Sequence, residues 1–365
     1  MYTTMTLQER SVQDYLDRLT QKQKIPGIQY LVLDQQDIRF EYYGGQRNIG
    51  AHLPVTPVTT FMASSSSKPL TATAILQLVE QGKVELDATL SSYYPDHPYG
   101  DQVTLRHLLN QTSGIPNPLP LKWIHSAETH PSFDQAAALK TVLNKHSKLA
   151  FIPGDKYAYS NISYWLLGVV IEQVSGQSYC DYMRQYVFEP LGAGPEELNC
   201  LIPDLAHHAQ GYQKKYSLLG LFLYLMMDKA LLAETEAGRF RIRPVYMNGT
   251  AYGGLIGTAR GFARFLQDQL QAKSILFNSD TKTLFYAHQQ NNRGEAIETT
   301  LGWHRGHIAN VPYYGKPGGG PGFRSNIRIY PDQALATVWF INETGVSEDA
   351  INTFTDRLDR QFLGV

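Results

Sequence analysis

The chain of 365 residues has little cysteine and almost no net charge. Its two cysteines, Cys180 and Cys200, lie 20 positions apart and lack the paired spacing of a zinc site or a redox motif. We therefore expect both to be reduced, buried side chains.

The 32 basic side chains are balanced by 33 acidic ones, so no overall field attracts nucleic acid or an anionic membrane. A small, largely uncharged molecule fits this balance better as a substrate.

Long hydrophobic runs are also missing. The longest, from Leu218 to Met227, has ten residues, about half of what a bilayer crossing needs. The first residues, up to Lys24, are polar and helix-patterned, without the apolar stretch and cleavage site typical of a secretory signal. We expect a cytoplasmic protein. A protein whose signal had been removed would look the same, which leaves a periplasmic or secreted location open.

The sequence shows neither the ligand spacing of a metal site nor the serine motif of an α/β-hydrolase. His107 and the pair His207 and His208 have no second pair at ligand spacing, so we expect no metal site. No G-x-S-x-G motif occurs, which disfavours a lipase of the α/β-hydrolase fold. The remaining candidates, His304 and His307, are predicted to line a loop and receive no role.

Strand-like segments occur at both ends of the chain. Two β-rich runs joined by a short polar turn predict a hairpin near the beginning, and three more strand-like runs come near the end. Because both ends supply strands, we predict one antiparallel sheet built from both termini. The segments are 27–34 and 37–45, then 301–306, 323–331 and 334–343, with terminal helices over 6–22 and 346–362.

The middle of the chain is dominated by helical periodicity. We predict an α/β domain from residues 1–66 and 291–365, and a mainly helical region over 67–290. Segment 213–250 is a candidate flap. Its apolar run fits a core or interface helix; alternatively, 216–233 covers an acyl pocket or contacts lipids or a partner surface. The expected helices cover 67–82, 103–111, 134–147, 161–175, 177–187 and 259–271.

The first chemical motif is a serine followed by a lysine. Ser65 stands three positions before Lys68 at the expected start of a helix, where side chains at that spacing share a face. Serine is a poor nucleophile until a base takes its proton, and a lysine withdrawn from water can be neutral enough to do so. Ser65 alone in the SSSS run has a lysine at this offset. The motif by itself also fits a helix N-cap.

The second motif is Tyr159-Ser160-Asn161, at the entrance to a strongly apolar helix. A phenol can relay a proton when a nearby cation lowers its pKa, and an amide can orient a substrate carbonyl. The alternative is a plain turn in which Asn161 caps the helix and Tyr159 packs.

The third motif places Lys316 before a glycine-rich run that leads into a strand. Glycines would let a substrate lie against the backbone, N–H groups can bind a developing oxyanion, and the lysine can supply positive charge. The alternative is a flexible hairpin turn with a solvated lysine.

Together the three motifs resemble the signature of the serine β-lactamase and penicillin-binding protein superfamily, in its class C β-lactamase and family VIII carboxylesterase branch. The resemblance extends over about residues 25 to 345. It implies a β-lactamase-like α/β sandwich, with an antiparallel sheet flanked by helices and an inserted, mainly helical subdomain. The active site would lie in the cleft between them and would need no metal or organic cofactor. Supporting similarity comes from segments 104–116, 190–192, 211–212, 251–266 and 301–303.

The resemblance also implies a role for each motif residue. Ser65 would attack an acyl carbon while Lys68 and Tyr159 manage its proton, and the charge of Lys316 would keep that pair poised. Backbone donors would stabilise the tetrahedral intermediates. The implied substrate-binding residues are Asn161, Lys316 and Gly318, and the implied oxyanion hole is the N–H of Ser65 and of Gly319.

One departure from the family pattern concerns Pro317, where antibiotic-hydrolysing relatives usually carry Thr or Ser. Proline has no hydroxyl and no N–H, so it cannot hold the carboxylate of a β-lactam. Proline also favours the edge of a sheet, which suits a strand lining an open cleft. The sequence therefore favours a carboxylesterase on small esters. The alternatives are a D-amino-acid peptidase or weak β-lactamase, an acyltransferase, and a noncatalytic binding protein of the same fold.

Overall fold

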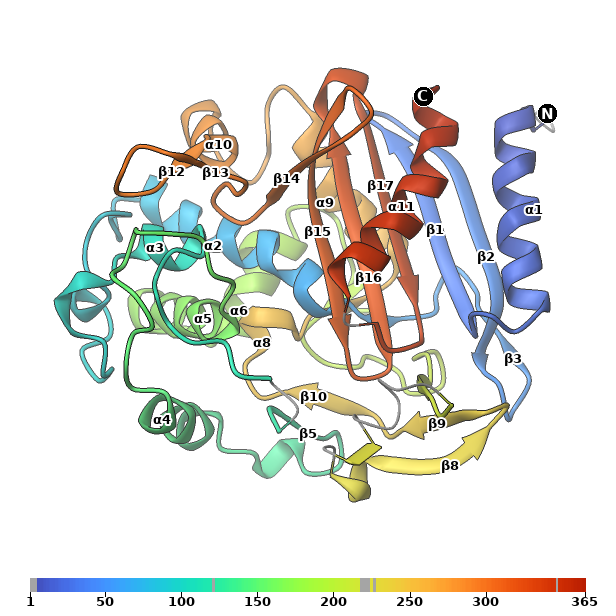
Figure 1. The fold of residues 1–365 in the computed structure, drawn as a ribbon, viewed down its shortest axis with the longest axis horizontal. Helices are drawn as coiled ribbons and strands as arrows, with labels where there is room; N and C mark the ends of the chain where they lie inside the picture. Colours follow the sequence, from blue (N-terminus) through green and yellow to red (C-terminus); the bar gives the residue numbers. More distant parts are fainter. Residues whose placement is uncertain (1–4, 120–121, 217–223, 226–227, 346) are drawn as a thin grey trace.

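A seven-stranded antiparallel sheet forms the centre of the fold (Figure 1). The computed structural model describes residues 5–119, 122–216, 224–225, 228–345 and 347–365. The strand order, β14-β15-β16-β17-β1-β2-β3, joins the first strands of the chain to the last ones, as the sequence predicts. The strands are β1 (Gly27–Asp34), β2 (Ile38–Asn48), β3 (Leu53–Pro54), β14 (His304–Ile308), β15 (Val311–Gly320), β16 (Phe323–Tyr330) and β17 (Leu335–Ile341).

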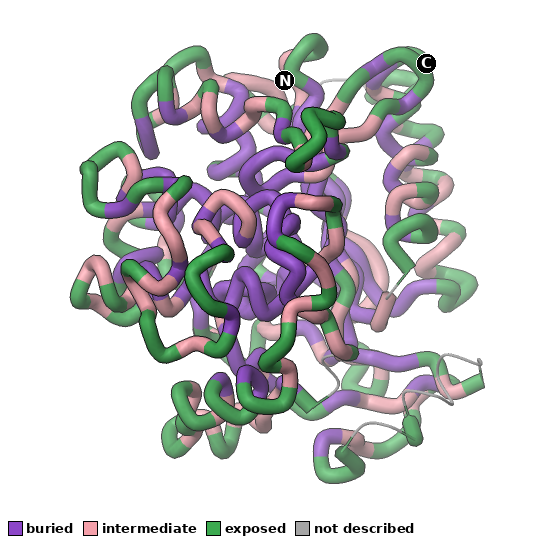
Figure 2. Tube along the Cα trace, turned by 60° about the vertical axis from the view of Figure 1, so that its left-hand side comes forward, coloured by how far each residue is buried: buried purple, intermediate pink, exposed green. Residues whose placement is uncertain are grey.

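Helices cover both faces of this sheet. Along β1, Tyr30 and Val32 pack toward the two terminal helices, whereas Leu31 and Leu33 pack into the larger core on the other side. Strand residues buried on both faces are typical of a sheet between two helical layers. Figure 2 shows the buried segments running through the middle of the molecule, with exposed segments around them. The fold is the α/β sandwich that the resemblance implies.

The helices begin and end where local chemistry dictates. Thr6 and Glu9 form a capping box at the start of the first helix. Ser160 caps the apolar helix that follows the second motif, and Gly176 ends it at φ 70°. The helices are α1 (Leu7–Gln21), α2 (Lys68–Glu80), α3 (Leu105–Leu109), α4 (Gln135–Lys145), α5 (Asn161–Ser175), α6 (Tyr179–Met183), α8 (Thr250–Gly253), α9 (Ala259–Leu270), α10 (Ser279–Tyr286) and α11 (Glu348–Leu363).

Short strands occur among the helices of the middle region. They form small sheets, of which β7-β9-β8 and β10-β5 belong to the candidate flap over 213–250 or pair with it. Most of the apolar run within that segment lies outside the described residues, so the flap stays a prediction, as does the division into two domains. The strands are β4 (Phe61–Met62), β5 (Ile124–Ser126), β6 (Leu198–Asn199), β7 (Gly211–Lys214), β8 (Leu232–Glu236), β9 (Arg239–Ile242), β10 (Val245–Met247), β11 (Ile256–Gly257), β12 (Gln289–Gln290) and β13 (Ala296–Ile297).

Two details differ from the sequence-based expectations. His304 and His307 lie in strand β14, not in a loop, because their segment pairs with β15 from His304 opposite Gly315 onward. Cys180 is only partly buried, whereas Cys200 is buried, and both are free thiols.

Within the described part of the chain, no helix has the length and apolar character needed to cross a membrane.

Candidate active site

Ser65 lies in a tight turn that the sheet holds from one side. Residues Ser64–Ser67 form a single 3-10 turn that runs directly into α2. The hydroxyl of Ser66 donates to the carbonyl of Lys316 on β15 at 2.7 Å and lies 2.9 Å from the hydroxyl of Ser325 on β16. Ser64 has φ 49°, a left-handed conformation that costs a residue with a side chain free energy. The turn and the third motif are therefore packed together, 250 positions apart in the sequence.

Lys68 is fully buried beside Ser65 and has three oxygen neighbours. Its Nζ lies 3.2 Å from Oγ of Ser65, 2.8 Å from Oδ1 of Asn161 and 2.5 Å from the carbonyl oxygen of Tyr252 on α8. Burial, reinforced by the charge of Lys316, holds the pKa of Lys68 well below its usual value. A neutral amine has two protons and one lone pair. Its two protons satisfy the two carbonyl oxygens, and the lone pair is left for the hydroxyl proton of Ser65.

Tyr159 lies on the other side of the same serine. Its hydroxyl oxygen is 2.6 Å from Oγ of Ser65. The side-chain nitrogens of Lys68 and Lys316 lie 4.9 and 4.7 Å from the centre of its ring. Burial raises the pKa of Tyr159, although its hydrogen bond with Ser65 works in the opposite direction. The resting phenol therefore keeps its proton and can donate it.

Asn161 is the first residue of α5, but it does not cap that helix. The hydroxyl of Ser160 accepts from the N–H of Ser163 and takes the capping role. The side chain of Asn161 is thereby free to accept from Lys68. The alternative reading, a plain turn capped by Asn161, is wrong for this reason.

The third motif occupies an open edge of the sheet. Pairing between β14 and β15 begins at Gly315, so within the described strands Lys316 and the residues after it have a neighbour only on the β16 side. Pro317, which has no N–H, fits such an edge. Gly318 is buried, and a Cβ there would lie 2.5 Å from the carbonyl oxygen of Ala63, so only glycine fits. Gly319 is exposed.

Six of the residues expected at the site thus lie together, although their catalytic roles stay predictions. Ser65, Lys68, Tyr159 and Asn161 are joined by direct side-chain contacts, and Lys316 adjoins the ring of Tyr159. Gly318 packs on the turn that carries the serine. The N–H groups of Ser65 and Gly319 remain the expected oxyanion hole.

Sequence reasoning missed two side chains and one carbonyl at this site. His304 lies 2.7 Å from Lys316 and 2.6 Å from Glu348 at the start of α11. The carbonyl of Tyr252 contacts Lys68. His304 directly follows the LGW segment, which the resemblance marked, and that position was the available signal.

A pocket of about 580 Å³ adjoins this histidine. His304 and Pro317 form part of its wall, and the charged residues around it are Glu298, Arg305, Glu348 and Asp349. The site therefore has space beside Lys316 for part of a substrate.

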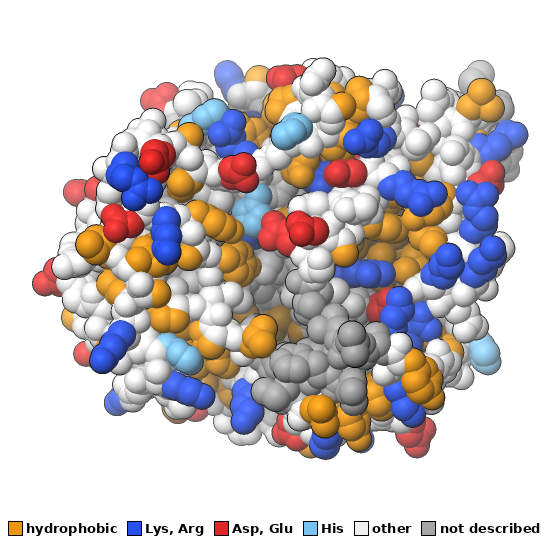
Figure 3. Space-filling view, viewed as in Figure 1, with side chains coloured by type: hydrophobic (Ala, Val, Ile, Leu, Met, Phe, Trp, Pro, Cys, Tyr) orange, Lys and Arg blue, Asp and Glu red, His pale blue; other side chains and the backbone are white. Residues whose placement is uncertain are grey.

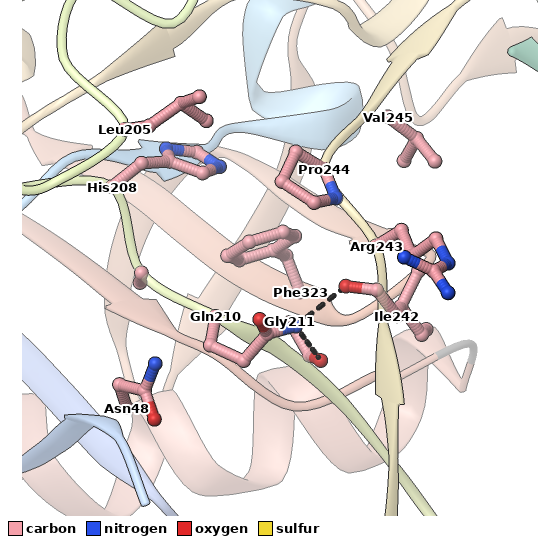
Figure 4. A pocket seen from close by; sticks show the side chains of 11 residues that line it. Asn48, Leu205, His208, Gln210, Gly211, Ile242, Arg243, Pro244, Val245 and Phe323 are labelled. Atoms are coloured by element: carbon pink, nitrogen blue, oxygen red, sulfur yellow. Dashed lines mark hydrogen bonds between the residues drawn. The ribbon is translucent and has the colours of Figure 1, made fainter. Parts of the chain in front are cut away.

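A second, smaller hollow lies away from the serine. Figure 4 shows His208 and Phe323 at this pocket, with Gln210 bonded to the carbonyls of Gly211 and Ile242. His208 is itself bonded to Thr60. His208 and Gln210 therefore already have hydrogen-bond partners within the protein.

The charged side chains and possible metal ligands among the described residues bear on whether another kind of site is present. The face shown in Figure 3 carries both acidic and basic side chains, with basic ones gathered toward its right-hand side. Among the residues that the structure describes, no group of three or more His, Cys, Asp or Glu side chains could hold a metal ion.

Comparison with known proteins shows the family to which the chain belongs. Penicillin-binding protein 4* of Bacillus subtilis (strain 168) is 27% identical over 342 residues, which cover 92% of this chain and 72% of that protein. The structure of D-amino acid amidase from Ochrobactrum anthropi SV3 is similar in fold, with a TM-score of 0.80 at 19% identity over 98% of this chain and 99% of that one. A class C β-lactamase gives a TM-score of 0.73 at 21% identity, covering 96% and 95% of the two chains. The β-lactamase family model matches residues 12–361, and the chain belongs to this family of serine hydrolases.

Proposed function

We propose that this protein is a serine hydrolase that acts through an acyl-enzyme on Ser65, with small carboxylic esters as its substrates. The observation that carries the proposal is the position of Lys68. Its buried amine lies 3.2 Å from Oγ of Ser65, while two carbonyl oxygens occupy its other directions. A low pKa and this geometry are what a general base for serine requires.

The reaction follows from the same contacts. Oγ of Ser65 bonds to the acyl carbon as its proton passes to Nζ of Lys68. The tetrahedral intermediate then collapses, the bond to the leaving alcohol breaks, and the hydroxyl of Tyr159 protonates the alcohol oxygen while Lys68 returns the proton to the phenol. Water next attacks the acyl carbon as Lys68 takes one of its protons; the bond between the acyl carbon and Oγ then breaks, the acid is released, and Lys68 returns the proton to Oγ of Ser65. The N–H groups of Ser65 and Gly319 would stabilise both oxyanions by a few kcal/mol per donor.

The surroundings of Pro317 support esters over β-lactams. A β-lactam carboxylate at this edge would meet a residue without a donor group. The adjoining pocket adds the carboxylate of Glu348 on its wall, which repels an anion. A neutral acyl group avoids both penalties.

Amides of D-amino acids are the second candidate. The fold similarity to D-amino acid amidase and the carboxylates near the pocket, Glu298 and Glu348, favour a substrate that carries an amine. The acyl-enzyme would be the same, since ester and amide hydrolysis differ only in the leaving group and the pocket. Weak β-lactamase activity, acyl transfer to an alcohol or amine, and noncatalytic binding are the remaining alternatives.

The test is turnover of p-nitrophenyl esters of increasing acyl length by wild type and Ser65→Ala. D-phenylalanine amide, its L isomer and a chromogenic cephalosporin are assayed alongside. Ester turnover that is lost in Ser65→Ala, with little cephalosporin turnover, supports the esterase. Turnover of the D amide alone would move the assignment to the amidase, and an inert wild type would contradict hydrolysis altogether.

A further inference from the structure

A chain of two hydrogen bonds leads from the active site to the last helix. Nζ of Lys316 lies 2.7 Å from Nε2 of His304, and Nδ1 of that histidine lies 2.6 Å from Oε1 of Glu348. The three residues belong to β15, β14 and the first position of α11. The ring of His304 also adjoins two tyrosines, since Nε2 lies 3.3 Å from the hydroxyl of Tyr157 and the ring centroid lies 6.4 Å from that of Tyr159.

The partners fix the protonation of the histidine. An ammonium group can only donate, so Nε2 of His304 accepts a hydrogen bond from Lys316. A carboxylate can only accept, so Nδ1 of His304 carries the proton and donates a hydrogen bond to Glu348. Burial and the charge of Lys316 lower the pKa of His304, which agrees with a neutral ring. A neutral imidazole thus bridges a cation and an anion.

We propose that His304 and Glu348 are positioning residues that hold the ammonium of Lys316 against the ring of Tyr159 and keep it charged during turnover. The inference rests on the proposed serine hydrolase and deepens it, because the charge of Lys316 adds to burial in lowering the pKa of Lys68 and so helps keep its amine neutral as the base for Ser65. Neither positioning residue touches the reacting atoms.

The electrostatics of Lys316 explain why it needs such support. Burial lowers its pKa to about 7, and the charge of Glu348 works in the opposite direction. Without that carboxylate, Lys316 would lose its proton at a lower pH, and Lys68 would lose the neighbouring charge that lowers its own pKa. The groups facing Lys316 are Lys68 on α2, Tyr157 and Tyr159 before α5, His304 on β14 and Glu348 on α11, with Glu298, Arg305 and Asp349 on the adjoining pocket wall.

A purely structural role for Glu348 is the competing explanation. It lies in the first turn of α11, where any carboxylate is favoured by the helix dipole. Asp349 lies in the same turn and shares that favourable position. Asp349→Asn is therefore the matched control, since it removes a charge from the helix start and leaves the bond between His304 and Glu348 in place.

The experiment measures the titration of Lys316 directly. The lysine side chains are labelled with ¹³C, the signal of Lys316 is assigned with Lys316→Arg, and its pKa is followed by NMR in wild type and variants. Glu348→Gln should lower the pKa of Lys316 by about one unit, and Glu348→Asp should recover part of the shift. Asp349→Asn should leave it within about 0.3 units. An unchanged pKa in Glu348→Gln, or an equal shift in Asp349→Asn, would overturn the proposal.

The pH profile of ester hydrolysis supplies the second readout. The alkaline limb of kcat/KM should move to lower pH in Glu348→Gln by the same amount as the NMR titration. If Glu348→Gln does not fold, His304→Gln serves instead and should show the same downward shift. A wild type that hydrolyses no ester contradicts the proposed function, yet the NMR titration still decides the role of the pair. If wild type hydrolyses esters but the alkaline limb of kcat/KM stays at the same pH in the variants, the proposed role of His304 and Glu348 is contradicted and the proposed function is not.

Discussion

The amine of Lys68 lies 2.8 Å from the amide oxygen of Asn161, which is 93 positions away in the sequence. This contact, with the one to the carbonyl of Tyr252, decides which direction the amine has left for Ser65. The fold therefore sets the orientation of the base as well as its pKa.

Replacing this base by a permanently charged residue should abolish acylation. Lys68→Arg keeps a cation that cannot deprotonate, so we expect kcat/KM for p-nitrophenyl acetate to fall by about a thousandfold or more. Lys83→Arg, an exposed lysine beyond the same helix, is the control. A Lys68→Arg variant within tenfold of wild type would show that the amine is not the base.

Removing the phenol hydroxyl should slow the reaction without unfolding the protein. In Tyr159→Phe the ring stays between the two lysines, but the proton donor 2.6 Å from Oγ of Ser65 is lost. We expect kcat to fall about a hundredfold, with a smaller change in KM. Steady-state kinetics measure this split, and Tyr164→Phe, whose hydroxyl bonds to the carbonyl of Leu109, tests for a general effect of losing a buried phenol.

A methyl group at Gly318 should disturb both stability and activity. Its Cβ would lie 2.4 Å from Oγ of Ser325 and 2.5 Å from the carbonyl oxygen of Ala63, so the turn that carries Ser65 must shift. Overpacking of this kind costs about 1–3 kcal/mol. Thermal unfolding and ester turnover are compared with Gly294→Ala, which adds its methyl in open space and bears only the left-handed backbone cost. Equal effects of the two substitutions would argue against a tight contact at Gly318.

The stability of the protein should depend on His208 in acid. Burial lowers its pKa to about 4, whereas an unfolded histidine titrates near 6.5. His208 thus binds a proton less readily in the folded state than in the unfolded state. Its contribution to the free energy of unfolding is therefore complete above pH 6.5 and is lost as the pH falls toward 4. The free energy of unfolding, measured with denaturant between pH 7 and 4, should fall more steeply with decreasing pH in wild type than in His208→Gln. The exposed neighbour, changed as His207→Gln, should keep the wild-type slope.

Local sequence patterns predicted the sheet from both termini, the helix at 161–175 and the meeting of Ser65 with Lys68, because these depend on periodicity and on a spacing of three residues. The contacts between motifs came from the resemblance, since no local rule brings Tyr159 to Ser65. His304 and Glu348 were missed for the same reason. Their partnership depends on where β14 begins and where α11 docks, and both are set by tertiary packing.

The most direct test of the central claim is to trap the acyl-enzyme. The protein is mixed with a p-nitrophenyl ester, quenched in acid within milliseconds to seconds, and examined by intact-mass spectrometry and peptide mapping. We predict a mass increase of one acyl group on Ser65 in wild type, slower formation in Lys68→Arg, and none in Ser65→Ala. Turnover that continues without an acyl group on this serine, or acylation at the same rate in Ser65→Ala, would contradict the account.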